Sequence, residues 1–356
     1  MAGEQTPLLK RDEAIMGNQT PAGIPGLPHT FTQTPPSSSD PSATTSSPRR
    51  LPQAIAHRGY KAAAPENSML AFRAAVEAGA HAIETDLHLS KDGVVVLSHD
   101  PSLKRCFGLD VKVRDCEWSY LRELKTLREP AQPMPSLREL LEYLNEPGRE
   151  HVWIMLDIKR DDDATEMMQK TAETIASVPG IRPWHERILP CCWTTEYIKL
   201  SMQYLPDFPV AHVGFSSTYA RALAQYVPSM SISMLYATLA LPFFGPRFIR
   251  DMKRAGHPVH SWTVNDEDWM EWAIKRELDG VVTDDPKLFL EVCRRAAEEG
   301  KEGGALRRTR VRIPLRRRLT RAIDWGRYFV FTIIITTIYL FKWGLPQRSV
   351  RKTFGK

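Results

Sequence analysis

Two carboxylates separated by a single residue are the first sign of chemistry in this chain of 356 residues. Glu84 and Asp86 belong to the run Ile83-Glu84-Thr85-Asp86-Leu87, and residues i and i+2 of a strand point to the same side. Converging carboxylates repel each other unless a cation lies between them, and Mg²⁺ or Ca²⁺ is the natural occupant. The alternative is that both carboxylates face solvent and pair with basic residues. The apolar Ile83 and Leu87, expected on the opposite side, favour the metal site.

Two histidines stand at the ends of hydrophobic runs, His57 after Gln53–Ala56 and His99 after Val94–Ser98. Placed on either side of a metal site, they suit general acid and general base catalysis at a phosphorus centre. Arg58 offers a planar fork for phosphate oxygens. Each residue alone is more often structural than catalytic, and Asp100 either orients His99 or begins the following loop.

A third acidic position follows in the run Trp153–Lys159. Asp157 and Lys159 share one side of the expected strand, so the carboxylate is a third candidate metal ligand and the ammonium is a candidate phosphate contact. A plain salt bridge is the alternative. Trp262 is expected either to line the site against a glyceryl or acyl group or to pack in the core. The sequence Asp284-Asp285-Pro286 is expected to cap the last helix of the barrel.

The elements that must position these residues alternate between short β-type runs and amphipathic helical stretches. Such alternation over about 250 residues predicts an α/β fold with a parallel sheet, and its length suits a TIM-type (β/α)8 barrel. Nine strands compete for eight places, and Val94–His99, which follows a short Asp-Gly turn, is predicted to be an extra hairpin strand. The expected strands are Gln53–His57, Ala82–Leu87, Val94–His99, Val152–Lys159, Arg187–Cys191, Val210–Val213, Met230–Leu235, Val259–Val264 and Gly280–Thr283. The expected helices are Asn67–Ala78, Leu137–Leu144, Ala164–Ala176, Ser217–Tyr226, Phe244–Ala255, Glu267–Lys275 and Pro286–Glu299.

The barrel is expected to occupy residues 51–300. Residues 1–50 are rich in Pro, Ser, Thr and Gly and are predicted to be disordered. We expect residues 301–322 to be an arginine-rich juxtamembrane linker, 323–345 a hydrophobic membrane segment and 346–356 a basic C-terminal tail.

The uncharged core of the membrane segment is short. Residues 328–341 would span about 21 Å as a helix, against a hydrocarbon core of roughly 30 Å. A full span of a thin bilayer and an insertion into one leaflet both remain open, with Arg327 and Lys342 able to snorkel. A buried barrel helix is disfavoured because the barrel is complete before residue 300.

Charge is distributed unevenly along the chain. Residues 301–356 hold fifteen Lys and Arg against two Asp and Glu, whereas the whole chain carries only +6. The body is therefore acidic, which argues against nucleic acid as a partner and for an anionic membrane as the partner of the basic end. The five cysteines lack metal-type spacing, so a reducing, cytosol-facing location is expected. Endoplasmic reticulum, lipid droplet and mitochondrial surface are not distinguished, and no obligate protein partner is inferred.

Taken in order, the motifs resemble the glycerophosphodiester phosphodiesterase family over residues 53–292. That resemblance implies a TIM barrel with a bound divalent ion, an acid–base pair of His57 and His99, and phosphate contacts from Arg58 and Lys159. It implies metal ligation by Glu84 and Asp86, whereas Asp157 stands where the family usually has glutamate. The motifs are His57-Arg58-Gly59, Pro65-Glu66-Asn67-Ser68, Glu84-Thr85-Asp86, His99-Asp100, Asp157-Ile158-Lys159, Trp262-Thr263-Val264-Asn265 and Thr283-Asp284-Asp285-Pro286.

Within that family the chain is most similar to fungal phosphatidylglycerol phospholipase C, on account of the last three motifs and the hydrophobic C-terminal extension. The resemblance implies cleavage of phosphatidylglycerol to diacylglycerol and glycerol phosphate. Hydrolysis of soluble glycerophosphodiesters or lysophospholipids is the alternative, and a non-catalytic membrane-bound scaffold is a third reading.

Overall fold

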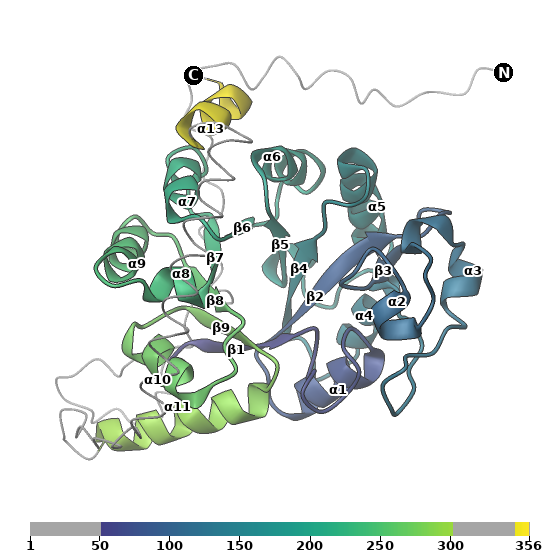
Figure 1. Ribbon diagram of the computed structural model, residues 1–356, viewed down its shortest axis with the longest axis horizontal. Coiled ribbons are helices and arrows are strands. Elements are labelled where there is room, and N and C mark those ends of the chain that lie inside the picture. The colour runs from purple at the N-terminus through teal and green to yellow at the C-terminus, as the bar shows by residue number, and fades with distance from the viewer. Residues whose placement is uncertain (1–50, 302–345, 356) are drawn as a thin grey trace.

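Eight parallel strands close into a barrel in the computed structural model, which describes residues 51–301 and 346–355 (Figure 1). Around the barrel the order is β1-β9-β8-β7-β6-β5-β4-β2, and β2 pairs with β1 to close the ring. The TIM-type barrel predicted from the sequence is confirmed. Its strands are β1 (Gln53–His57), β2 (Ala82–Leu89), β4 (Trp153–Ile158), β5 (Ile188–Cys192), β6 (Ala211–Gly214), β7 (Ser231–Leu235), β8 (Val259–Trp262) and β9 (Gly280–Thr283).

The ninth strand, β3 (Val95–Leu97), lies outside the ring. It runs antiparallel to the far end of β2, with Leu97 opposite Leu87 and Val95 opposite Leu89. Since β1 pairs with β2 only as far as Glu84, the outer end of β2 is free for β3. The prediction that this run is an extra hairpin strand is confirmed.

Helices form the outer layer of the barrel (Figure 1). Polar side chains begin several of them: Ser136, for example, forms a capping box with Glu139 at the start of α4. The outer helices are α1 (Met69–Glu77), α4 (Leu137–Leu144), α5 (Ala164–Ala176), α6 (Thr195–Tyr204), α7 (Ser217–Ala224), α9 (Phe244–Arg254), α10 (Glu267–Lys275) and α11 (Pro286–Lys301). Short elements in the connections are α2 (Lys104–Phe107), α3 (Trp118–Leu121), α8 (Tyr236–Ala240) and the 3₁₀ turns η2 (Val113–Asp115) and η3 (Trp184–Glu186).

Strand residues alternate between two apolar clusters. Ile55, Ala82 and Met155 belong to the cluster inside the barrel, whereas their neighbours Ala54 and Ile83 pack between the strands and the helices. This period of two decides which residues can reach the interior at the carboxyl ends of the strands, where barrel enzymes place their active sites.

The C-terminal residues described by the structure form α13 (Pro346–Phe354), which packs against α6 and α7. Val350 is fully buried there, the Thr353 hydroxyl donates to that of Thr195 at 3.1 Å, and Phe354 stacks on Tyr226. The stretch expected to be a basic tail therefore contains a docked helix.

The predicted disordered tail (1–50), the rest of the arginine-rich linker after Lys301 and the predicted membrane segment (323–345) lie outside the described residues. In the part of the chain that is described, no helix has the length and apolar character needed to cross a bilayer.

Candidate active site

Three carboxylates meet inside the barrel at the carboxyl ends of β2 and β4. Oxygens of Glu84, Asp86 and Asp157 all lie within 4.8 Å of one another, and all three residues are buried. Asp86 stands directly opposite Asp157 in the β2–β4 ladder, and Glu84 and Asp86 share the interior side of β2 with Ala82. The structure thus brings together the three residues expected to be metal ligands.

The charges around this acidic cluster do not balance. The Lys159 ammonium lies 2.7 Å from Asp86 Oδ1 and 2.6 Å from Asp157 Oδ2. Burial raises the pKa of Glu84 well above its ordinary value, and the carboxylates of Asp86 and Asp157 raise it further. The pKa of Asp86 is held below its usual range, because Lys159 and Arg58 outweigh the effect of burial. Three buried carboxylates, one of which has a raised pKa, are an all-oxygen ligand set that fits a hard divalent cation such as Mg²⁺ or Ca²⁺.

Arg58 is tied to the cluster by its backbone and its side chain. Its N–H donates to Glu84 Oε2 at 2.9 Å, its Nη1 donates to Glu66 Oε1 at 2.8 Å, and its Nε lies 3.3 Å from Asp86 Oδ2. The residue adopts φ +57, a left-handed conformation that costs energy for any residue with a Cβ. These contacts hold the guanidinium beside the cluster, where it is available to phosphate oxygens.

His57 is paired with Asp284. Its Nδ1 lies 2.6 Å from Asp284 Oδ1, which leaves Nε2 for a substrate. Burial lowers the pKa of His57, although Asp284 acts in the opposite direction. The sequence assigned Asp284 to the helix cap, but only Asp285 has that role, accepting from the Leu288 N–H at 2.9 Å. Asp284 is the first residue after β9, and that position at the carboxyl end of a strand was the signal that could have identified it.

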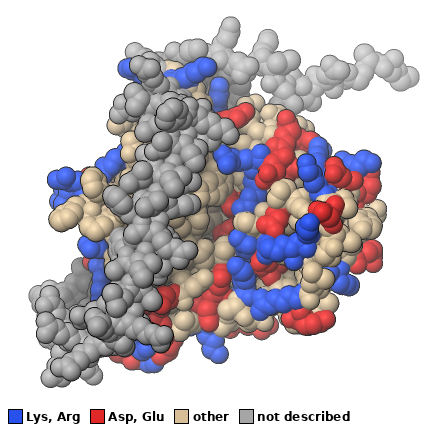
Figure 2. Space-filling view, viewed as in Figure 1, with Lys and Arg blue, Asp and Glu red and all other residues tan. Residues whose placement is uncertain are grey.

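His99 has an acidic partner of its own. Its Nδ1 lies 2.6 Å from Asp100 Oδ1, so Asp100 does contact the histidine that it follows. Asp100 also accepts from Arg105 Nε at 2.6 Å, and Arg105 forms a two-pronged pair with Glu66. Burial lowers the pKa of His99. Charged side chains of both signs crowd this half of the face, over α1 to α4 (Figure 2), and this chain of ion pairs connects His99 with Arg58.

Two further residues that sequence reasoning missed hold the carboxylates in place. Asn67 Nδ2 donates to Asp86 Oδ2 at 2.9 Å, and the Thr85 hydroxyl donates to the Asn67 side-chain oxygen at 2.8 Å. Trp193 Nε1 donates to Asp157 Oδ1 at 2.7 Å. Asn67 was expected to begin a helix and lies in one of the family motifs, but it was given no role at the site, and nothing in the sequence connects Trp193 with Asp157.

A cavity of about 240 Å³ opens between these groups. Both histidines, the acidic cluster, Arg58 and Lys159 line one side of it. The other side is aromatic: the Trp262 ring lies 5.8 Å from that of Trp193 and 5.3 Å from that of Phe215. Trp262 therefore both lines the cavity and packs in an aromatic cluster, which unites its two expected roles.

Comparison with known proteins identifies the same kind of molecule. The family model described as glycerophosphoryl diester phosphodiesterase matches residues 57–288. A glycerophosphodiester phosphodiesterase of Caldanaerobacter subterraneus is 27% identical over 68% of this chain and 97% of its own length. Human lysophospholipase D GDPD1 is 33% identical, but only over 36% of this chain and 42% of its own.

Solved structures agree in fold. The glycerophosphodiester phosphodiesterase of Thermotoga maritima superposes with a TM-score of 0.56 at 28% identity, over 67% of this chain and 98% of that one. A Silicibacter pomeroyi structure titled as a putative glycerophosphoryl diester phosphodiesterase has a TM-score of 0.62 at 19% identity, over 69% and 94%.

Proposed function

Because this chain belongs to the glycerophosphoryl diester phosphodiesterase family and is a phosphodiester hydrolase, we propose that it cleaves the phosphodiester of a glycerophospholipid. The specific proposal is a phospholipase C type reaction that converts phosphatidylglycerol to diacylglycerol and glycerol phosphate. The observation that carries it is one cavity with the acidic cluster and two His–Asp pairs on one side and aromatic rings on the other.

We assign the cation to Glu84, Asp86 and Asp157, where Mg²⁺ or Ca²⁺ would neutralise the carboxylates and act as a Lewis acid toward a phosphate oxygen. Arg58 and Lys159 supply the remaining positive charge beside that position. Their N–H groups are fixed before substrate arrives, so they stabilise charge that develops on the phosphate without reorganisation.

His57 and His99 move the protons. One histidine accepts the proton of the glycerol 2-hydroxyl as its oxygen forms a bond to phosphorus, and the other donates a proton to the departing diacylglycerol oxygen. The resulting cyclic phosphate is then opened by water, with the two histidines exchanging roles. An internal nucleophile gains from proximity. Each histidine has a carboxylate on Nδ1, so either is oriented for either role.

The cavity favours recognition of the head group. Its volume of about 240 Å³ is below the roughly 300–1,000 Å³ of sites that enclose a drug-sized ligand. A glycerophosphoryl group therefore fits inside, whereas two acyl chains must remain outside. The aromatic wall around Trp262 suits the glyceryl part next to them.

Hydrolysis of soluble glycerophosphodiesters or lysophospholipids is the second candidate function. The same head group occupies the cavity in both cases, and the names of the relatives, glycerophosphodiester phosphodiesterase and lysophospholipase D, include both activities. A non-catalytic, membrane-bound scaffold is disfavoured, because this family member retains both histidines and all three carboxylates.

We further propose that residues 323–345 attach the enzyme to a membrane with the barrel facing the cytosol, on the endoplasmic reticulum, a lipid droplet or the mitochondrial surface. The docking of α13 supports a particular arrangement. Because α11 and α13 both belong to the barrel, the two ends of an intervening membrane segment would lie on the same side of the bilayer. That favours insertion into one leaflet over a full span.

The test is product analysis with the full-length chain on phosphatidylglycerol vesicles, with and without a chelator, beside His57→Ala. Metal-dependent release of diacylglycerol and glycerol phosphate, lost in the variant, is expected. Hydrolysis only of a soluble glycerophosphodiester in parallel samples would move the assignment to the second candidate. A variant with residues 323–345 replaced by a Gly/Ser linker of equal length keeps α13 in place and should lose far more activity on vesicles than on the soluble diester.

A further inference from the structure

Two phenylalanines protrude from the barrel at the start of α9, shortly after α8. Phe243 is 88% exposed and Phe244 75% exposed. Phe243 also adopts φ +62, a left-handed conformation that is unfavourable for a bulky side chain. The turn is fixed by Gly245, where a Cβ would lie 1.8 Å from the Leu239 carbonyl oxygen. Neither core packing nor backbone preference accounts for an aromatic residue at this position.

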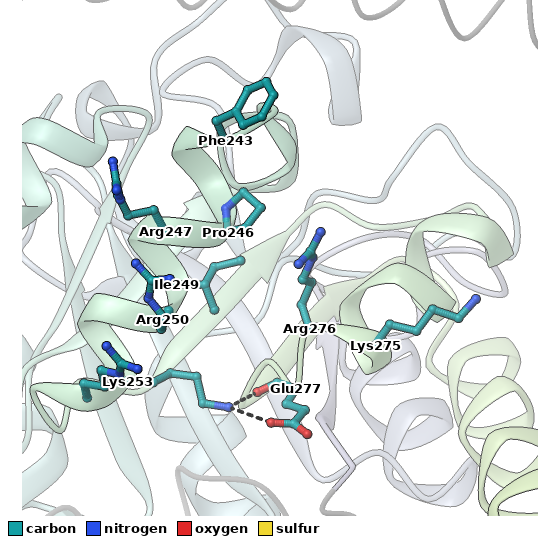
Figure 3. A pocket seen from close by; sticks show the side chains of 10 residues that line it. Phe243, Pro246, Arg247, Ile249, Arg250, Lys253, Lys275, Arg276 and Glu277 are labelled. Atoms are coloured by element: carbon teal, nitrogen blue, oxygen red, sulfur yellow. Dashed lines mark hydrogen bonds and ion pairs between the residues drawn. The ribbon is translucent and has the colours of Figure 1, made fainter. Parts of the chain in front are cut away.

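Directly beside the phenylalanines, α9 and α10 enclose an open groove of about 800 Å³ (Figure 3). Phe248, Ile249 and Met252 anchor α9 to the core, which turns the arginines of the helix outward. Six basic residues and one acidic residue line the groove: Arg247, Arg250, Lys253, Arg254, Lys275, Arg276 and Glu277. Figure 3 shows Phe243 at one end, with the arginines of α9 and Arg276 on opposite sides.

Three of these six basic residues have an acidic partner: Arg250 pairs with Asp251 at 3.5 Å, Lys275 with Glu271 at 2.9 Å, and Lys253 with Glu277. Glu277 contacts Lys253, at 2.6 Å through its carbonyl and 3.7 Å through its carboxylate. Arg247, Arg254 and Arg276 form no ion pair with any residue that the structure describes. Guanidinium groups without an acidic partner are suited to binding phosphate.

The phenylalanines lie on the face that carries the active site. Helix α8 follows β7 without a gap, and segments after the carboxyl ends of the strands form the catalytic face of a barrel. The Thr238 hydroxyl of α8 donates to the Phe215 carbonyl at 3.0 Å, and Phe215 lines the active-site cavity. The protruding pair therefore follows a segment that contacts a cavity-lining residue on the catalytic face.

We propose that Phe243, Phe244 and the basic groove form a docking surface for an anionic phospholipid bilayer. The phenylalanines enter the interface between head groups and acyl chains, and the groove arginines contact lipid phosphates. Charge complementarity selects this occupant over the chain's own residues 302–345, which hold ten basic and two acidic residues. The proposal concerns other residues than 323–345 and does not require the lipid to be the substrate.

A fluorescent probe at residue 243 of the full-length chain tests this directly. The variant Phe243→Cys is labelled with NBD in a Cys106→Ser background, since Cys106 is the one cysteine that is not buried in the described part of the chain. Phosphatidylserine vesicles with chelator present should shift its emission to the blue, whereas phosphatidylcholine vesicles should not. The matched position is Ile181→Cys, also highly exposed at 59% but in the connection that precedes β5, and its probe should not respond.

The arginines are tested in the same labelled chain. Arg247→Gln with Arg250→Gln should raise the lipid concentration for half-maximal response about fivefold or more. The charge-matched pair Arg138→Gln with Lys170→Gln, on α4 and α5 across the barrel (Figure 1), should change it less than twofold. The proposal is wrong if the probe at residue 243 stays silent while the protein sediments with vesicles, or if it responds equally to neutral lipid. A larger response to RNA than to vesicles would assign the groove to nucleic acid instead.

Discussion

Replacement of Asp284 by asparagine tests the carboxylate that pairs with His57 and that also accepts from Asn265 Nδ2 at 3.0 Å. Asp284→Asn keeps the size of the side chain and leaves the backbone N–H of residue 284 bonded to the Asn265 oxygen at 2.8 Å. It removes the negative charge that lies 2.6 Å from His57 Nδ1. An amide can also donate to Nδ1, which would force the imidazole into the tautomer with its proton on Nε2.

The expected loss follows from the strength of that bond. A hydrogen bond to a charged partner contributes about 1.5–3 kcal/mol, and each 1.4 kcal/mol corresponds to about one decade in rate. The variant should therefore lose between about tenfold and roughly 150-fold in kcat/KM. A tautomer error would raise the loss beyond this range, since the equivalent change in a serine protease triad costs about 10⁴.

The assay is release of glycerol phosphate from a soluble glycerophosphodiester at saturating divalent metal, which avoids any effect of membrane binding. Asp285→Asn is the matched control: it alters the neighbouring acid, which caps α11, and asparagine caps helices equally well. The control should keep kcat/KM within threefold and both variants should keep the wild-type melting temperature.

The pH profile provides a second readout. Asp284 raises the pKa of His57 against the effect of burial, so its removal should lower that pKa further. Whichever limb of the profile reports His57 should then move to lower pH, whether the residue acts as acid or as base. A kcat/KM within threefold of wild type with an unmoved profile would refute the assignment of Asp284 as the positioning residue of His57.

Three further predictions concern the charges around the cluster. Because burial raises the pKa of Glu84, metal binding should release up to about one proton and should become tighter as the pH rises. Calorimetry in two buffers measures the released proton, which should be absent in Glu84→Gln. Two arginines outweigh burial and lower the pKa of Glu66 to about 2. Up to roughly 3 kcal/mol of the free energy of unfolding should therefore be present above pH 4.5 and lost as the pH falls toward 2. In urea unfolding, the stability of Glu66→Gln should depend less on pH than that of the wild type. Trp193→Phe removes the donor to Asp157 and should weaken metal binding about 10- to 100-fold in titrations, whereas Trp262→Phe, which removes an indole N–H without a partner in the described chain, should not.

The barrel and the acidic cluster were predictable because both depend on local periodicity. Alternation with a period of two places Glu84 and Asp86 on one side of β2, and strand–helix alternation brings the carboxyl ends of all strands to one face. Helix α6 was missed, because Thr195–Tyr204 mixes β-branched and aromatic residues that favour strands.

The partners of the functional residues could not be predicted in the same way. His57 and Asp284 are 227 residues apart, and only closure of the barrel makes β1 and β9 neighbours. Sequence spacing carries no information about such a contact, so the adjacent acids of the last motif were interpreted by the local rule for helix caps. That rule holds for Asp285 and fails for Asp284.

The charges that line the cavity indicate the order in which the metal ion and the phosphodiester bind. Glu84, Asp86 and Asp157 contribute three negative charges when ionised, and Arg58 and Lys159 contribute two positive ones, while burial favours neutral histidines. Full ionisation would leave the free site with a residual charge of −1, and the raised pKa of Glu84 relieves that charge by protonation of its carboxylate. A divalent cation changes that balance to +1, which matches the single negative charge of the substrate. On this reasoning the cation must bind before the phosphodiester, and raising substrate concentration should not compensate for removal of the metal in steady-state kinetics.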